Sequence, residues 1–182
     1  MNGQMMPIFA SMASTRVQNV VTRKLEQTIN DYIVGQNVTY QDMVTLEKDE
    51  SGTITALTSN MSRLNGMRNG IFIEVSKAVE TVDTQELSLP AGNLTGLSFL
   101  SGRGFRLPVR IVSVGSARAE FSQSFSAAGI NQTHHQIMLR VTVTVDILLP
   151  GETVTTQVNT EVCAAETVIV GSVPQTYLQL NP

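Results

Sequence analysis

The sequence is poor in the residues that most often carry chemistry. Its 182 residues contain one cysteine, two histidines and no tryptophan, and only 15% of them are charged. A single cysteine excludes an intrachain disulfide and a metal site built on several cysteines. The net charge is −3, and the arginines and lysines are scattered along the chain. No basic face of the kind that binds nucleic acid is visible, so we expect no nucleic-acid partner.

Long apolar stretches are also missing. No run of 18 apolar residues occurs, so the sequence as given contains no transmembrane helix, and it has no signal-peptide pattern. Hydrophobic residues nevertheless make up 42% of the chain, which is typical of a folded domain. A length of 182 residues fits one domain with a sizeable core. We therefore expect a single α+β domain over residues 1–182.

The N-terminal half predicts two amphipathic helices. In residues 8–34, and again in residues 60–83, apolar side chains recur at steps of three and four. Residues 37–58 lie between these helices, alternate in polarity and contain the turn sequence KDESG, which predicts a β-hairpin. A short strand, TQELSLP, is predicted at residues 84–90. Residues 7–90 therefore predict an α-β-β-α-β unit.

The C-terminal half changes to a period of two. It is preceded by a glycine-rich connection, residues 91–108, whose composition is typical of irregular backbone with positive φ angles. In residues 109–182, apolar and polar residues then alternate through three long segments joined by turn sequences. This pattern predicts a three-stranded antiparallel meander. The whole order predicts an α+β fold in which the two helices pack on the sheet.

The two histidines, His134 and His135, stand side by side. Adjacent side chains on a strand point to opposite faces, so these two cannot readily bind one metal ion, and no further ligands have suitable spacing. His135 shares the parity of the apolar Ile137 and Leu139, so we expect it to be half-buried and hydrogen-bonded. The preceding turn contains Gly129 and Asn131, residue types that adopt positive φ.

Candidates for catalysis are few. Cys163 is best interpreted as a small buried residue, because nothing in the sequence supplies a matched base. Glu161 and Glu166 are five residues apart on a predicted strand, so an unbroken strand would point them to opposite faces. We therefore predict no catalytic residue, no metal site and no cofactor. An enzyme acting on the cell wall or on a small molecule is kept as an alternative that needs such groups in one pocket.

The glycine-rich connection is a second candidate site. Its sequence Gly-Arg-Gly at 102–104 lacks the spacing and the following helix of a phosphate-binding loop. A pocket lined by residues 92–106 would instead indicate a small-ligand or lipid-binding module. The candidate structural or interaction residues are Gly92, Gly96, Gly102, Gly104, Gly129, Asn131 and His135.

Five segments carry a resemblance when they are taken as an ordered set. They are YQDMVTLEKDESGTITAL at 40–57, LPAGNLTG at 89–96, GRGFRLPVRI at 102–111, AGINQTHHQIMLRV at 128–141 and AETVIVGSVPQTYL at 165–178. Together they resemble the YunB-type sporulation proteins of endospore-forming bacteria. The sequence departs from the family pattern at Phe105 and Cys163, where a proline is more usual, and at His134, where a basic residue is more usual.

The resemblance implies a biological setting but no reaction. Family members typically carry a short basic N-terminus, one transmembrane helix and then this domain, so we expect that the sequence lacks the anchor of a single-pass membrane protein. Positive charge before the anchor would hold that end in the cytoplasm. The domain would then lie on the extracytoplasmic side, which in a sporulating cell includes the space between the mother-cell and forespore membranes.

The resemblance also implies a role without catalysis. We expect a structural or interaction protein of spore formation, whose partner is another protein of the sporulating cell or a second copy of this chain. The α-β-β-α-β order is also that of ring-building modules in some sporulation and secretion assemblies, which is an analogy at the level of the fold. Ring-forming oligomerisation and small-ligand or lipid binding are therefore kept as alternatives.

Overall fold

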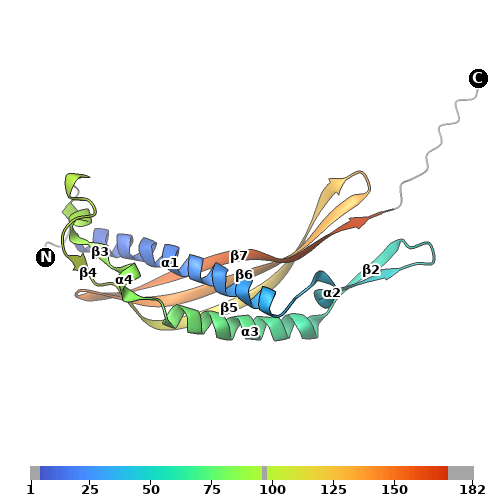
Figure 1. The fold of residues 1–182 in the computed structure, drawn as a ribbon, viewed down its shortest axis with the longest axis horizontal. Helices are drawn as coiled ribbons and strands as arrows, with labels where there is room; N and C mark the ends of the chain where they lie inside the picture. The colour runs from blue at the N-terminus through green and yellow to red at the C-terminus, as the bar shows by residue number, and fades with distance from the viewer. Residues whose placement is uncertain (1–4, 96–97, 172–182) are drawn as a thin grey trace, which may run out of the picture.

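Three antiparallel strands run through the length of the molecule (Figure 1). The computed structural model describes residues 5–95 and 98–171. The strands are β5 (Arg110–Gly129), β6 (Gln132–Leu149) and β7 (Glu152–Val170), and they form one sheet in the order β5-β6-β7. The predicted meander is therefore confirmed.

The alternation of strand β6 gives this sheet an inner and an outer face. Every second side chain from Ile137 to Leu149 is buried, whereas the residues between them are half-buried or exposed. Successive side chains of a strand point to opposite faces, so this period of two places one continuous apolar stripe on the inner face. The outer face keeps polar residues such as Thr142 and Thr144.

Two long helices cover the inner face. Helix α1 (Met5–Gly35) packs against β7, and helix α3 (Met61–Glu80) packs against β5. Each helix buries one stripe, and the stripes consist of Phe9, Ala13, Val17, Val20, Val21, Leu25 and Ile29 in α1 and Leu64, Met67, Ile71, Val75 and Val79 in α3. None of the helices in residues 5–95 and 98–171 is long and apolar enough to cross a membrane. The predicted α+β class, with two helices on the sheet, is confirmed.

The predicted hairpin is present, but it is separate from the large sheet. Strands β1 (Val44–Lys48) and β2 (Ile54–Ser59) pair only with each other among the described residues. The expected first strand is interrupted by a short helix, α2 (Tyr40–Met43), just before β1. The backbone N–H and the hydroxyl of Thr39 both donate to Asp42 Oδ2 at 2.8 Å. This local capping overrides the alternating pattern that predicted an extended chain here.

The strand predicted at residues 84–90 is mostly wrong. Residues Thr84–Leu87 form helix α4, because Asp83 caps it by accepting a hydrogen bond from the backbone N–H of Gln85 at 2.9 Å. Only β3 (Leu89–Pro90) is extended, and it pairs with β4 (Arg106–Leu107). The connection between them contains two short 3-10 helices, η1 (Ala91–Thr95) and η2 (Ser98–Leu100).

Candidate interaction surfaces

A polar network surrounds His135, a buried residue on the inner face of the sheet. The Tyr40 hydroxyl lies 2.6 Å from His135 Nδ1, and His135 Nε2 lies 3.2 Å from Gln123 Oε1. Both contacts are satisfied by the neutral tautomer, in which Tyr40 donates to Nδ1 and Nε2–H donates to the Gln123 oxygen. Burial lowers the pKa of His135 below its ordinary value, which favours this neutral form.

The same network connects two parts of the molecule. Gln123, in β5, also donates from Nε2 to the Ser59 hydroxyl at 2.6 Å, at the end of β2. The Phe125 ring stacks on the imidazole of His135 with centroids 4.3 Å apart and an interplanar angle of 8°. We call these residues, Tyr40, Ser59, Gln123, Phe125 and His135, the latch. The latch joins residues 40–59, which we call the arm, to the large sheet.

His135 is more buried than its sequence position indicated. We expected a half-buried side chain, but its exposed fraction is 0%. Helix α2, which the alternating pattern did not predict, brings Tyr40 to the imidazole with its ring edge-on at 5.5 Å between centroids. The extra burial therefore comes from a contact across 95 residues of sequence.

His134 lies on the outer face, where it contacts Glu166. Its Nε2 is 3.0 Å from Glu166 Oε2, and Gln136 donates from Nε2 to the same oxygen at 3.1 Å. These hydrogen bonds, first from Gln136 and then from His134, lower the pKa of Glu166. The two adjacent histidines thus have different surroundings, and the structure does not bring them to one site.

A β-bulge in β7 changes the faces of several candidate residues. Cys163 pairs with Met138 and Ala165 pairs with Ile137, so Ala164 is an extra residue without a cross-strand partner. After the bulge the parity of β7 is reversed, because one residue has been added to the alternation. Two expectations about β7 are corrected, and the bulge accounts for the first of them.

The first correction concerns the glutamates. Glu161 pairs with Arg140 and Glu166 pairs with Gln136, and the bulge places both carboxylates on the outer face. The expectation of opposite faces held only for an unbroken strand. Glu161 accepts from Arg140 Nη2 at 3.1 Å, so it is engaged in a surface ion pair.

The second correction concerns Cys163, which is exposed and not buried. Its Sγ lies 3.6 Å from the carbonyl oxygen of Ala165 and 4.0 Å from Glu166 Oε2. Partial desolvation and the nearby charge of Glu166 raise the pKa of this thiol. A raised pKa lowers the thiolate fraction, which is the reactive form, so the surroundings of Cys163 do not activate it.

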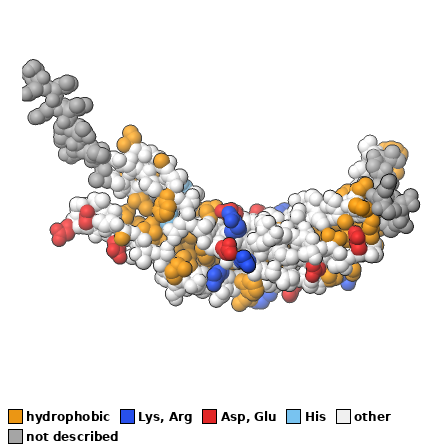
Figure 2. All heavy atoms as spheres, turned by 180° about the vertical axis from the view of Figure 1, so that it is seen from behind, with side chains coloured by type: hydrophobic (Ala, Val, Ile, Leu, Met, Phe, Trp, Pro, Cys, Tyr) orange, Lys and Arg blue, Asp and Glu red, His pale blue; other side chains and the backbone are white. Residues whose placement is uncertain are grey.

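The outer face of the sheet is broad and mostly uncharged. Figure 2, which views the molecule from behind, shows white side chains over most of the surface and a group of red and blue ones near its middle. On the outer face, Glu120 pairs across the strands with Arg140, which pairs in turn with Glu161. The charges alternate in sign across the three strands, which favours cross-strand attraction over repulsion.

The glycine-rich connection folds onto itself. A Cβ added to Gly92 would lie 1.9 Å from the carbonyl oxygen of Leu100 and 2.5 Å from that of Arg103, so no larger residue fits there. Gly102 and Gly104 have φ angles of +77° and +94°, which favour glycine. These candidate residues therefore allow the connection to close on itself; Gly96 lies outside the described residues.

The turn between β5 and β6 has the predicted chemistry. Gly129 has a φ of +156° and Asn131 a φ of +58°. The Asn131 carbonyl accepts from the backbone N–H of Gly171 at 2.7 Å, which connects this turn to the end of β7. Both residues shape the tip of the hairpin.

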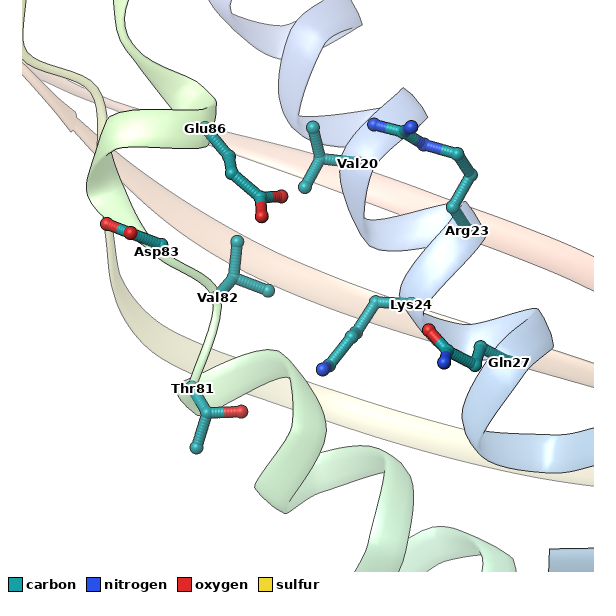
Figure 3. A pocket seen from close by; sticks show the side chains of 8 residues that line it. All are labelled: Val20, Arg23, Lys24, Gln27, Thr81, Val82, Asp83 and Glu86. Atoms are coloured by element: carbon teal, nitrogen blue, oxygen red, sulfur yellow. The ribbon is translucent and has the colours of Figure 1, made fainter. Parts of the chain in front are cut away.

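A hollow of about 340 Å³ lies between α1 and the chain around α4 (Figure 3). Arg23 and Lys24 line it from α1, and Asp83 and Glu86 line it from the opposite side. Two basic and two acidic groups balance each other, so the hollow has no excess charge that would select an ionic ligand. The hollow is therefore a polar contact region between α1 and α4.

A longer groove runs between α3 and β5. Two neighbouring hollows of about 530 and 280 Å³ share Arg68 and Glu120 and extend along β5 from Ala117 to Gln123. Apolar side chains line it, namely Met61, Leu64, Phe72, Phe121 and Ile137. Strand β5 is an edge of the three-stranded sheet, so its outer backbone groups border this groove. The sequence carried no signal for this α3–β5 groove, because it depends on where α3 lies across β5.

The chain has a recognisable family. The profile of the family described as Sporulation protein YunB (Spo_YunB) matches residues 86–176, which is half of the chain. The chain is also 23% identical over 186 aligned positions to "Sporulation protein YunB" of Bacillus subtilis (strain 168), covering 97% of this chain and 73% of that protein. No solved structure matches. The chain therefore belongs to the YunB family of sporulation proteins.

Proposed function

We propose that this sporulation protein acts by binding other proteins and not by catalysis. The observation that carries the proposal is the combination of a free sheet edge, an apolar groove beside it and a projecting arm. Unpaired edges and exposed apolar grooves are the surfaces on which protein partners add. The proposal adds a mode of action to the role in sporulation that the family supplies.

The surroundings of the chemically reactive groups also support a role without catalysis. His135 is enclosed in the latch, and the raised pKa of Cys163 disfavours its thiolate. Within residues 5–95 and 98–171, no group of three or more His, Cys, Asp or Glu side chains is placed to hold a metal ion. The space around Gly92 is filled by the carbonyl oxygens of Leu100 and Arg103, so we do not favour the small-ligand alternative at this connection.

We further propose that an anchor before α1 tethers the domain to a membrane on its extracytoplasmic side. This part rests on the resemblance to family members that carry such an anchor. The N-terminal end of α1 and the arm lie at opposite ends of the elongated molecule (Figure 1). An anchor joined to α1 would therefore hold the arm far from that membrane, where it can meet a partner.

Complementation of sporulation tests the mode of action. The gene is deleted in the bacterium that encodes it, and the full-length protein or a variant is returned. We expect Cys163→Ala and His134→Ala to restore the number of heat-resistant spores, because neither side chain is needed for a binding role. Loss of spores with Cys163→Ala, at a normal protein level, would contradict the proposal and favour an enzyme.

Protease accessibility tests the proposed membrane orientation separately. An epitope tag is placed in the turn between β1 and β2 of the full-length protein, and sporulating protoplasts are treated with protease. If the domain lies outside the cytoplasm, the tag is exposed on the surface of the mother cell. We therefore expect the protease to cleave the tag without lysis of the protoplasts. Cleavage only after lysis, at the stage before the forespore is engulfed, would place the domain in the cytoplasm.

A further inference from the structure

The hairpin of the arm projects from the body. Within residues 5–95 and 98–171 its two strands pair only with each other, and they extend beyond the N-terminal end of α3 (Figure 1). An isolated two-stranded hairpin is marginally stable in water. Its apolar side chains at Leu46, Ile54 and Leu57 are half-buried, and of these Leu46 and Leu57 already pack against the core. The arm therefore has the features of an element that gains stability by packing against something else.

The tip of the arm is nevertheless well ordered by its own hydrogen bonds. Asp49 Oδ1 accepts from the backbone N–H groups of Ser51 and Thr53, each at 2.9 Å, and from the Ser51 hydroxyl at 2.6 Å. These bonds hold the turn in one conformation. A preformed element loses less conformational entropy when it binds.

The arm also carries the net charge of the whole chain. It contains four acidic residues, Asp42, Glu47, Asp49 and Glu50, and one basic residue, Lys48, which gives −3. The rest of the chain has 11 basic residues (12 − 1) and 11 acidic residues (15 − 4), so it is neutral. An acidic arm on a neutral body selects a partner surface on which basic groups prevail.

The α3–β5 groove offers such a surface. Its charged side chains are two arginines, Arg68 and Arg118, and one glutamate, Glu120. Arg118 Nη1 and Glu120 Oε1 form an exposed ion pair at 3.8 Å, with 77% and 59% of the two side chains exposed, so the excess basic charge of the groove is one. Its apolar lining and the free edge of β5 match the half-buried apolar side chains and the free edges of the arm.

The arm and the groove lie end to end. The hydrogen bond between Gln123 and Ser59 marks the point where the groove ends and the arm begins. Strands β1 and β2 have 5 and 6 residues, and the groove spans the stretch of β5 from Ala117 to Gln123. At about 3.3 Å per residue, these elements extend roughly 16 to 23 Å. A rotation of 180° about an axis through this junction, perpendicular to the line of arm and groove, would bring each arm along the other copy's groove.

We propose that two copies of this chain exchange arms, each laying its β1–β2 hairpin in the partner's α3–β5 groove. The interface is isologous, so it closes on itself at two copies. Acidic and basic side chains then face each other at similar distances from the junction. Glu47 lies three residues beyond Val44, or about 10 Å, and Arg68 lies seven helical residues beyond Met61, also about 10 Å. Glu50 similarly reaches the level of Arg118.

This pairing names the partner for the binding role proposed above, namely a second copy of the chain. It rests on that proposed role and adds the identity of the partner. It also differs from the ring alternative, because a ring needs two different surfaces joined head to tail. The pairing is tested on the purified chain, without reference to sporulation. A chain that stays monomeric would overturn the arm exchange and leave the role in sporulation unaffected.

Sedimentation equilibrium with charge-reversed variants is the first test. We expect the chain to form a dimer, and Glu47→Lys with Glu50→Lys to raise its Kd by about tenfold or more, because like charges then face each other. Arg68→Glu with Arg118→Glu should do the same. All four changes together should restore much of the dimer, since the charges are complementary again. A monomer, a larger ring or a dimer indifferent to these changes would each overturn the proposal.

Cross-linking locates the contact. In a Cys163→Ser background, Glu50→Cys combined with Arg118→Cys should give a covalent dimer with a short bismaleimide. The matched control combines Glu50→Cys with Lys77→Cys, because Lys77 lies near the far end of α3. Equal cross-linking of both pairs would show that the contact is elsewhere.

Discussion

The two ends of the sheet are held by different kinds of interaction. Where α1 and α3 cover the sheet, residues such as Val143 and Val145 face apolar helix stripes and are fully buried. Toward the β5–β6 turn the helices no longer cover the sheet, and Phe125 and Ile130 are 56% and 89% exposed. At the start of this uncovered region, the latch holds the base of the arm through hydrogen bonds that include the buried His135. Apolar packing stabilises the body and also the base of the arm, where Met43 and Val44 are buried, whereas directional hydrogen bonds position the arm against the sheet.

The largest effect is expected in the covered region. Leu139→Ala removes a side chain that is 0% exposed and leaves a cavity, so we expect the free energy of unfolding to fall by about 2–5 kcal/mol. Leu148→Ala is the matched control, because Leu148 is in the same strand but 44% exposed, and surface changes cost about 0.5 kcal/mol. Urea unfolding followed by circular dichroism measures both. Similar decreases in the free energy of unfolding of the two variants would show that burial under the helices does not decide how much a β6 side chain contributes to stability.

The next effect is expected in the latch. Tyr40→Phe removes the hydroxyl that contacts His135 Nδ1 and leaves a buried acceptor unpaired, which costs about 1–3 kcal/mol. Hydrogen exchange should become faster in the arm and stay unchanged in the centre of β6. Replacing both partners, with His135→Phe added, should recover part of the loss, because no unpaired polar group is then buried. If the single variant leaves exchange in the arm unchanged, the latch does not hold the arm.

A dependence on pH of intermediate size should come from the same histidine. Burial lowers the pKa of His135 in the folded state, whereas in the unfolded chain it is about 6.5. Below about pH 6.5 the unfolded chain therefore binds the proton more readily, so stability falls as the pH decreases through 6.5 and levels off below the folded-state pKa. Tyr40, the titratable side chain that contacts His135, has its pKa raised by burial and stays protonated throughout.

Urea unfolding at pH values between about 8 and 5 measures this dependence. The variant His135→Phe should lose the fall below about pH 6.5, because the titrating group is gone. The acidic side chains with lowered pKa values, such as Glu166 and Asp146, act only at lower pH. A wild-type stability that rises as the pH falls from 7 to 5.5 would contradict the assignment.

The smallest effect is expected for the neighbouring histidine. His134 contacts Glu166 on the exposed outer face, with 29% and 57% of the two side chains exposed. Exposed ion pairs contribute little, so His134→Ala should change the free energy of unfolding by no more than about 0.5 kcal/mol. The comparison with Tyr40→Phe is direct, since both changes remove one hydrogen bond to a histidine. A decrease of more than about 1 kcal/mol in the free energy of unfolding would mean that contacts on the outer face also contribute appreciably to stability.

The long elements were predictable because each repeats one pattern many times. The stripe in α1, from Phe9 to Ile29, and the alternation of β6, from Ile137 to Leu149, each extend over many residues. Asn60, a residue type that favours helix N-termini, caps α3 by accepting from the backbone N–H of Arg63 at 3.1 Å. Long periodic segments leave few alternative structures that bury the same side chains.

The short elements were missed because single side chains decide them. Helices α2 and α4 have four residues each, too few for a periodic pattern, and both begin at local hydrogen bonds to Asp42 and Asp83. Two glycines of α3 also differ only through tertiary contacts. A Cβ added to Gly70 would clash with the Tyr32 side chain, whereas one added to Gly66 would meet nothing within 4 Å.

The candidate residues also fall into two groups, those whose role depends on local sequence and those whose surroundings depend on distant contacts. Gly102, Gly104, Gly129 and Asn131 adopt the positive φ angles that their residue types favour, so their role in turns was visible in the sequence. The burial of His135 was underestimated, because Tyr40 reaches it from 95 residues away. Cys163 shares the parity of the exposed Glu161, and the bulge at Ala164 brought Glu161 and Glu166 to one face. No local pattern marks a bulge in a strand of small and polar residues.

The sequence by itself determined the two helices, the three long strands, their inner face and the family, because these depend on patterns repeated along the chain. Only the tertiary structure decided where the arm is latched, which groups surround His135 and where the α3–β5 groove lies. These features depend on contacts between segments far apart in sequence, and such contacts are set by packing in three dimensions. A binding surface formed in this way has no signature in the order of the residues alone.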